Sequence, residues 1–298
     1  MRKKILLHKK FPLYRIRESL TGILLCLPAI AGMAVFFLIP FAVCVYLSMT
    51  ESTGSSAFVG LANYRDIFTS AAFRLAAGNT LLFNGIAVPV IMVFSFLIAL
   101  MLYRKLKGSE FFRAVFIFPL VLPAASVVLF FRTAFSGEGV VNGFLEKLGN
   151  APVDWFGSES NIIVLVILYV WKNCGYNIIL FLAALNSIPK EYYESAAIDG
   201  AGGVKQLLRI TLPLILPYSF FVLIISIINS FKSFREAYIL FGNYPEGKGY
   251  MLQHFMNNNF NNLNYIRLAC GAVTIFGVIF VFVLALMWLK DRSGDVEL

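Results

Sequence analysis

The sequence predicts an all-α integral membrane protein with six transmembrane helices. Hydrophobic residues make up 59% of its 298 positions and charged residues only 14%, with a mean hydropathy of +0.78. A soluble globular chain has roughly a quarter of its residues charged, so much of this surface should face lipid. A helix needs about 20 apolar residues to cross the hydrocarbon of a bilayer, and six such runs occur. We expect them at residues 20–49, 80–102, 111–131, 162–185, 212–230 and 268–289.

The flanks of the first run indicate the orientation of the chain. Residues 1–19 hold seven Lys and Arg, and the run behind them is too long for a cleaved signal peptide. We therefore expect a retained first helix at 20–49, behind a basic tail that meets anionic lipid and not nucleic acid. With the N-terminus inside, cytoplasmic segments hold 16 Lys and Arg and outer segments hold 8. The positive-inside rule predicts that both termini, including a tail at 291–298, are cytoplasmic.

The segment at residues 186–213, between the fourth and fifth runs, differs from the other expected cytoplasmic loops. Pro189 suits the first turn of a helix, and Glu191 beside it favours the helix dipole. Gly200 can adopt positive φ and end that helix, while Pro213 begins the next span. The pattern predicts two short helices joined by a turn.

This segment resembles the EAA loop of permeases from binding-protein-dependent ABC importers. The family pattern is Glu-Ala-Ala, three residues, Gly, nine residues, and Ile-x-Leu-Pro. Here Glu194 and Gly200 stand at that spacing, Ser195 replaces the first Ala as a small-for-small change, and Leu212-Pro213 completes the pattern. The likeness covers nearly the whole chain, and it is to sugar permeases of the maltose and glycerol-phosphate type.

The resemblance implies a type I ABC importer permease fold, with the permease core at residues 76–290 and a coupling loop at 186–213. In that family the loop docks into a cleft of a cytoplasmic ATPase subunit. Glu194 would then pair with a basic group of the ATPase, and the small residues would allow close packing. An ordinary amphipathic loop between two spans is the alternative. The residues assigned to coupling are Glu191, Glu194, Ala196, Asp199, Gly200, Ala201, Leu212 and Pro213.

Polar and aromatic side chains inside two spans are candidates for a substrate path, because polar groups in a membrane are costly. The fourth run carries a Trp, a Tyr and amides near its midpoint, and the fifth carries polar residues on one helical face. A sugar needs hydroxyl partners and flat aromatic surfaces, and the resemblance puts the family's sugar site at several of these positions. The alternative is that the aromatics fill the bundle and the serines bond to their own helix. The assigned residues are Trp171, Tyr176, Asn177, Ser226, Asn229, Ser230 and Ser233, whereas we expect Lys172 to be structural or snorkelling.

Other chemistry is disfavoured. The stretch 242–249 nearly matches a phosphate-binding loop, but Gly249 replaces the required Ser or Thr and no strand precedes it. No Asp, Glu or His lies inside the six expected runs, which argues against a membrane-embedded enzyme. The four cysteines lack metal-ligand or disulfide spacing, so we expect small buried residues and no metal site. We expect no catalytic residue and no cofactor on this chain, with ATP and Mg²⁺ bound by a partner.

The sequence therefore predicts a multi-pass permease subunit of the cell membrane, which moves a mono- or oligosaccharide in an ATP-driven importer. Expected partners are a second homologous permease, a cytoplasmic ABC ATPase dimer and an extracytoplasmic sugar-binding protein. That binding protein could meet the outer loops, including the Asn-rich stretch 257–264, although a solvated loop is the simpler interpretation. A permease for another solute, such as a glycerol-phosphodiester or a peptide, would want Arg or Lys facing the cavity, and only Lys172 qualifies. A secondary transporter is the remaining alternative.

Overall fold

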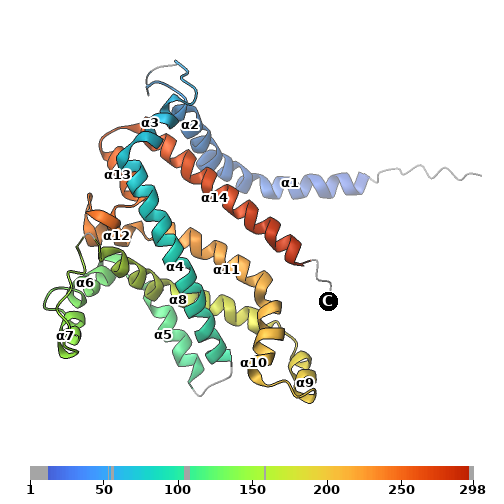
Figure 1. Ribbon diagram of the computed structural model, residues 1–298. Helices are drawn as coiled ribbons and strands as arrows, with labels where there is room; N and C mark the ends of the chain where they lie inside the picture. Colours follow the sequence, from blue (N-terminus) through green and yellow to red (C-terminus); the bar gives the residue numbers. More distant parts are fainter. Residues whose placement is uncertain (1–12, 53, 55–56, 104–107, 158, 295–298) are drawn as a thin grey trace, which may run out of the picture.

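The computed structural model describes residues 13–52, 54, 57–103, 108–157 and 159–294 (Figure 1). Five helical stretches within this part are long and apolar enough to cross a membrane, and one bent helix pair makes a possible sixth span. The described residues form no strand, apart from an isolated bridge between Thr50 and Phe58. The all-α membrane fold is confirmed.

The helices follow the apolar runs and add short pieces at both ends of the bundle. A π turn at Ala34–Leu38 joins α1 to α2, and another at Leu207–Thr211 joins α10 to α11. The elements in chain order are α1 (Leu13–Met33), α2 (Ile39–Ser48), α3 (Ala62–Thr69), α4 (Ala71–Tyr103), α5 (Ser109–Val121), α6 (Ala124–Ala134), α7 (Val140–Lys147), α8 (Asn161–Asn186), α9 (Lys190–Ile198), α10 (Gly203–Gln206), α11 (Leu212–Lys232), α12 (Phe234–Phe241), α13 (Leu252–Asn261) and α14 (Tyr265–Gly294).

The third expected span, residues 111–131, is divided into two helices, α5 and α6, which together make a possible bent span. The chain bends by 100° between α5 and α6. Pro123 disfavours helical backbone in the residue before it, and both Leu122 and Pro123 are extended, with ψ of 139° and 137°. The second half of the run, α6, therefore turns aside and packs against α12.

Several helices extend past the expected boundaries. The expected basic tail at 1–19 lies partly in α1, which begins at Leu13, while residues 1–12 lie outside the described part. The second span begins at Ala71 and not near residue 80. The fifth continues through α12, so the apolar stretch Gly203–Phe241 includes Glu236. The last helix reaches Gly294 and takes in part of the expected tail at 291–298.

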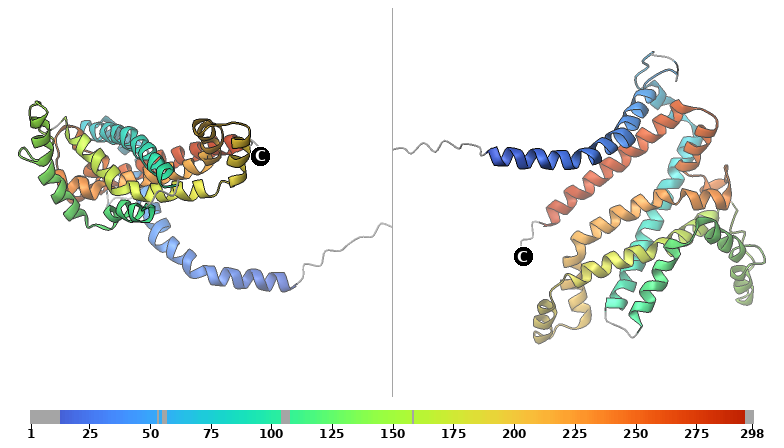
Figure 2. Two further views of the ribbon diagram at one scale, coloured as in Figure 1. Left: turned by 90° about the horizontal axis from the view of Figure 1, so that it is seen from below. Right: turned by 180° about the vertical axis from the view of Figure 1, so that it is seen from behind.

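The first span stands apart from the body of the molecule. Figures 1 and 2 show α1 leading away from the other helices, while α2 lies along α14. None of the apolar window of Gly22–Ser48 is buried, and Phe36 and Phe37 are 74% and 71% exposed. Cys26 is also exposed here, contrary to the expected burial of the cysteines, whereas Cys174 and Cys270 are buried. The exposed face of this span is available to contact lipid or another protein.

The bundle is built around α8, which packs against α4, α5 and α11. Half of its apolar window is buried, the largest share among the five stretches. Aromatic pairs join it to α4, with ring centroids 5.7 Å apart for Phe83 and Tyr169 and 5.5 Å apart for Phe96 and Phe181. Because lipid tails are as apolar as these side chains, this fit and not hydrophobic burial holds the helices together.

Gly175 allows the closest approach in the bundle. A Cβ atom at this position would lie 2.0 Å from the carbonyl oxygen of Phe116 and 2.5 Å from its carbonyl carbon. Both atoms belong to the backbone of α5, so no side-chain movement could relieve the clash. The glycine therefore fixes where α5 crosses α8.

We predict that Gly175→Ala forces α5 away from α8 and lowers stability by about 1–3 kcal/mol or more, the usual cost of overpacking. The matched control is Gly85→Ala in α4, where a Cβ would meet nothing within 4 Å. Thermal unfolding in detergent measures the melting temperature of each purified variant. Equal melting temperatures for the two variants would contradict the close approach.

Candidate functional site

The expected coupling loop forms two short helices around a turn, as the sequence predicted. Helix α9 ends in a left-handed cap at Gly200, whose φ is +75°. The amide of Gly200 donates to Ala197 O at 3.1 Å, and that of Ala201 donates to Ala196 O at 2.8 Å. This pair of bonds satisfies the last carbonyls of α9 and needs a residue that tolerates positive φ. The predicted backbone role of Gly200 is confirmed.

Polar contacts tie this turn to the base of α11. The Gln206 side chain donates from Nε2 to Ala201 O at 3.0 Å. The hydroxyls of Tyr193 and Thr211 share a hydrogen bond of 3.0 Å, which links α9 directly to the residue before α11. Pro213 lies in the first turn of α11, directly after the π turn Leu207–Thr211. These contacts join α9 and its turn to the base of α11.

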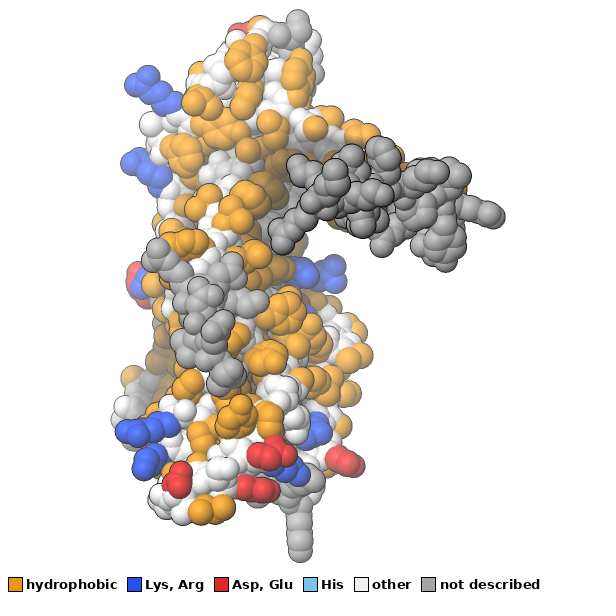
Figure 3. Space-filling model, turned by 90° about the vertical axis from the view of Figure 1, so that its right-hand side faces the viewer, with side chains coloured by type: hydrophobic (Ala, Val, Ile, Leu, Met, Phe, Trp, Pro, Cys, Tyr) orange, Lys and Arg blue, Asp and Glu red, His pale blue; other side chains and the backbone are white. Residues whose placement is uncertain are grey.

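The loop presents both charged and apolar side chains to its surroundings. Glu191, Glu194 and Asp199 are exposed, whereas Ala196 and Ala201 are half-buried and Leu212 and Pro213 are exposed. Figure 3 shows acidic side chains gathered at the lower end of the molecule, where α9 and α10 lie in Figure 1.

Two apolar residues flank the turn, Ile198 with 87% and Val204 with 73% of the side chain exposed. A Cβ added at Gly200 would meet nothing within 4 Å, so the close packing expected there must come from outside this chain. This mixed, open surface suits a protein partner better than it suits lipid.

The residues assigned to the substrate path separate into two groups. Trp171 and Tyr176 are each 37% exposed, and Asn229 and Ser233 are half-buried. Trp171 packs against Phe130 and Phe131 of α6, with ring centroids 6.4 and 5.8 Å away. The other group is Asn177, Ser226 and Ser230, which are at most 5% exposed.

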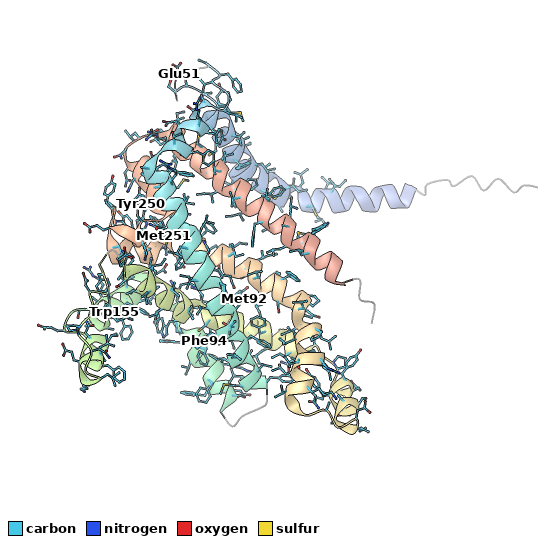
Figure 4. The ribbon with its side chains drawn as sticks, viewed as in Figure 1. Glu51, Met92, Phe94, Trp155, Tyr250 and Met251 are labelled. Carbon is cyan, nitrogen blue, oxygen red and sulfur yellow. The ribbon has the colours of Figure 1, made fainter. Side chains whose placement is uncertain are left out.

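The buried group joins three helices. Asn177 donates from Nδ2 to Ser226 Oγ at 2.7 Å, and the Tyr169 hydroxyl donates to Ser226 O at 2.6 Å, so α8 is bound twice to α11. Ser226 Oγ in turn donates to Val222 O at 2.8 Å and lies 3.9 Å from the sulfur of Met92. Figure 4 labels Met92, which belongs to α4. Ser230 Oγ donates to Asn84 Oδ1, also in α4. In this conformation the hydroxyls of Ser226 and Ser230 bond to their own helix and to neighbouring helices, as the alternative to a substrate path predicted.

An ion pair between Lys172 and Glu236 was missed by the sequence analysis. Lys172 Nζ binds Glu236 Oε1, with the two side chains 17% and 6% exposed. The expectation that no acidic residue lies within a span is thus corrected, since α12 extends the fifth span and carries Glu236 inward. The signal in the sequence was Lys172 itself, because a cation in the middle of a span requires a partner.

The stretch 242–249, rejected as a phosphate loop, is hydrogen-bonded to the N-terminal parts of α4 and α8. Asn79 donates from Nδ2 to Gly247 O and Tyr250 O, each at 2.8 Å, and Asn161 donates to Glu246 O at 2.8 Å. These two asparagines were not singled out from the sequence. Their side chains fix the loop that follows α12.

The Asn-rich stretch is not a simple solvated loop. Its first half lies in α13, and the buried Asn258 donates from Nδ2 to Asn243 O at 3.0 Å. His254 is fully buried in the same helix and accepts the amide of Met251 at 3.3 Å. Burial lowers the pKa of His254 to about 4, so this side chain stays neutral at physiological pH.

Apolar spans that cross at close contact define this chain as a multi-pass, all-α membrane protein. The family model described as the binding-protein-dependent transport system inner membrane component matches residues 91–292. The chain belongs to this family and is a permease of an ABC importer. The resemblance inferred from the coupling loop is confirmed.

Curated relatives extend the match over most of the chain. The arabinooligosaccharides transport system permease protein AraP of Bacillus subtilis is 34% identical over 280 residues, covering 90% of this chain and 88% of that protein. The sn-glycerol-3-phosphate transport system permease protein UgpA of Yersinia pestis is 36% identical over 212 residues, covering 70% and 72%. The family assignment thus rests on sequence as well as shape.

Solved structures show the same fold. A bacterial ABC transporter involved in the import of the acidic polysaccharide alginate superimposes with a TM-score of 0.81 at 23% identity, covering 94% of this chain and 98% of that one. The alginate transporter in complex with a periplasmic protein bound to an alginate pentasaccharide gives a TM-score of 0.82 at 24% identity, covering 96% and 99%. Both superpositions are consistent with the type I importer permease fold.

We predict that Lys172→Met destabilises the bundle by about 3–5 kcal/mol, because it leaves Glu236 buried without its counter-charge. Lys248→Met is the matched control. Lys248 pairs with Glu159 at 2.5 Å, but their side chains are 38% and 78% exposed, and exposed pairs contribute about 0–1 kcal/mol. Thermal unfolding in detergent separates the two variants. If Lys172→Met and Lys248→Met have the same melting temperature, the Lys172–Glu236 pair does not stabilise the bundle.

Proposed function

We propose that this chain is one of two permease subunits of an importer that moves a sugar delivered by an extracytoplasmic binding protein. The observation that carries the proposal is the capped turn at Gly200 with its exposed apolar flanks, set at the end of the two helices that hold the polar residues. The AraP relative, named for arabinooligosaccharides and matched over 90% of this chain, supports a saccharide as the substrate.

A second permease completes the path in this proposal. A polar sugar needs polar lining on all sides, because an open groove would face lipid. This chain provides such groups mainly on α8 and α11, and so forms one wall. The outward faces of α1 and of the π turn Ala34–Leu38, with large exposed side chains such as Leu25 and Phe36, offer apolar area for lipid or for that second subunit.

ATP hydrolysis belongs to a partner in this proposal, with ATP and Mg²⁺ held there. A cytoplasmic ABC ATPase dimer docks one domain on each permease, and here it meets Glu194 and the turn at Gly200. The 16-to-8 distribution of Lys and Arg supports placing this loop and both termini in the cytoplasm. The opposite end, with α7 and α13, would face the binding protein.

The proposed sugar lining in this conformation narrows to the accessible residues Trp171, Tyr176, Asn229 and Ser233. Asn177, Ser226 and Ser230 become available only if α8 and α11 separate during the transport cycle. A permease for a glycerol phosphate or glycerol-phosphodiester is the second candidate, supported by the UgpA relative, which is named for sn-glycerol-3-phosphate.

We predict that the purified chain in liposomes neither hydrolyses ATP nor concentrates a sugar such as arabinotriose or maltotriose. Uptake should appear only when a second permease, an ATPase and a binding protein, taken from the genes beside its own, are added with ATP. Radiolabelled uptake and phosphate release measure this. Concentrative uptake by the chain alone, driven by an ion gradient, would instead identify a secondary transporter.

We predict that Gly200→Val uncouples the complete importer, because a β-branched residue at positive φ costs on the order of 1–3 kcal/mol and distorts the docking turn. ATP-driven uptake should fall roughly tenfold or more while the amount of inserted protein stays normal. Gly200→Asn is the control, since Asn tolerates this conformation. Wild-type uptake by Gly200→Val would remove the loop from the coupling path. If uptake falls equally in both variants, the role of Gly200 is to leave space for the partner and not to adopt a positive φ.

A further inference from the structure

A hollow of about 610 Å³ opens where α8, α12 and the end of α11 meet. Lys172, Lys232, Phe234, Arg235, Glu236 and Gln253 are among its lining residues. Lys172 lies 11 residues after Asn161, the first residue of α8, which is about 16 Å of helix rise. The hollow therefore reaches well into the span from the end that we assign to the outer side.

The charges around this hollow do not balance. Lys172 is neutralised by its ion pair with Glu236. Lys232 and Arg235 are exposed, and the ion pairs found in the described part of the chain include neither of them. His254, next to Gln253, adds no charge because burial keeps it neutral. Two positive charges are left over in one concave site.

Snorkelling to lipid headgroups is the simpler account of two cations near the end of a span. Two features argue against it. The cations border the same hollow as a buried ion pair and not a convex lipid-facing surface. The lining also includes an aromatic ring and an amide, Phe234 and Gln253, which suit the flat face and the hydroxyls of a sugar.

We propose that this hollow binds an anionic group, a carboxylate or a phosphate, carried by the sugar that passes through the permease. The inference rests on the proposed function for the identity of the substrate as a sugar. Arg235 can hold such a group with two parallel N–H bonds, and Lys232 adds a point charge. The Lys172–Glu236 pair holds α12 against α8 and so positions Arg235. Gln253 and Phe234 contact the sugar beside the charge.

The test uses the purified full chain in nanodiscs of phosphatidylcholine, with binding measured by calorimetry. Trigalacturonate is compared with its uncharged methyl ester, and galactose 1-phosphate with galactose, so that carboxylate and phosphate are examined separately. We expect at least one charged probe to bind roughly tenfold tighter than its neutral counterpart. The preference should weaken between about 0.05 and about 0.5 M salt, because exposed charges are screened.

Substitutions test which cations produce the preference for the charged probes. The double variant Lys232→Gln/Arg235→Gln should lose the preference, and Arg235→Lys should keep part of it because the charge remains. Lys147→Gln, at an exposed cation of α7 outside the hollow, should bind like the wild type. Circular dichroism and size-exclusion profiles verify that each variant is folded.

Four results would overturn the inference. They are equal affinity for charged and neutral probes, a preference that survives in the double variant, no binding of either charged probe at about 10 mM, and displacement of both probes by phosphatidylglycerol in the nanodisc. The last result would assign the hollow to lipid headgroups. None of these results bears on ATP-driven uptake, so failure here and failure of the proposed function can be told apart.

Discussion

Gly175 brings the backbone of α8 against the carbonyl of Phe116, and the arrangement of the other helices depends on this contact. In a bilayer the apolar surfaces gain little by leaving lipid for protein, so shape and hydrogen bonds decide which helices adhere. A glycine at the crossing allows α5 to lie against α8 without a side chain between them. The remaining faces of α8 are then free to meet α4 and α11, where aromatic pairs and polar bonds hold them.

The same central helix connects the two ends of the molecule. Its C-terminal end leads through α9 to the turn at Gly200, and the Tyr193–Thr211 hydrogen bond links that segment to α11. Higher up, Asn177 and Tyr169 bind α8 to Ser226 of α11. The turn at Gly200 is therefore linked to two helices that the bonds to Ser226 already join.

The sequence predicted the features that local chemistry determines. Run length identified the spans, and the Gly and Pro spacing identified the turn at Gly200, because positive φ and a missing N–H are properties of single residues. Proline inside a span was less informative. Pro89 and Pro217 are accommodated within α4 and α11, whereas Pro123 ends α5, and only the packing of α6 on α12 distinguishes these outcomes.

Contacts between distant residues were beyond the sequence. Lys172 and Glu236 are 64 positions apart, and their pairing requires α12 to continue the fifth span toward α8. The burial of Ser226 could not be predicted either. The sequence showed that its helical face is polar, but not which helix packs against that face. The Asn-rich stretch appeared solvated by composition, yet Asn258 is buried because α13 packs against α4 and α14.

The Lys172–Glu236 pair also explains why two neighbouring cations remain without partners. Burying an ion pair costs desolvation that its attraction only partly offsets, so two apolar residues of similar volume would hold α12 at least as well. Stability alone therefore does not account for the pair. A carboxylate at residue 236 neutralises Lys172 and leaves Lys232 and Arg235 as the unpaired cations that line the hollow. In the proposed anion site, an unpaired Lys172 would add a third positive charge inside the span and bind the anion more strongly. Transport requires binding that is strong enough for entry and weak enough for exit, so the proposal assigns the attraction to the two exposed cations and leaves the deeper position neutral.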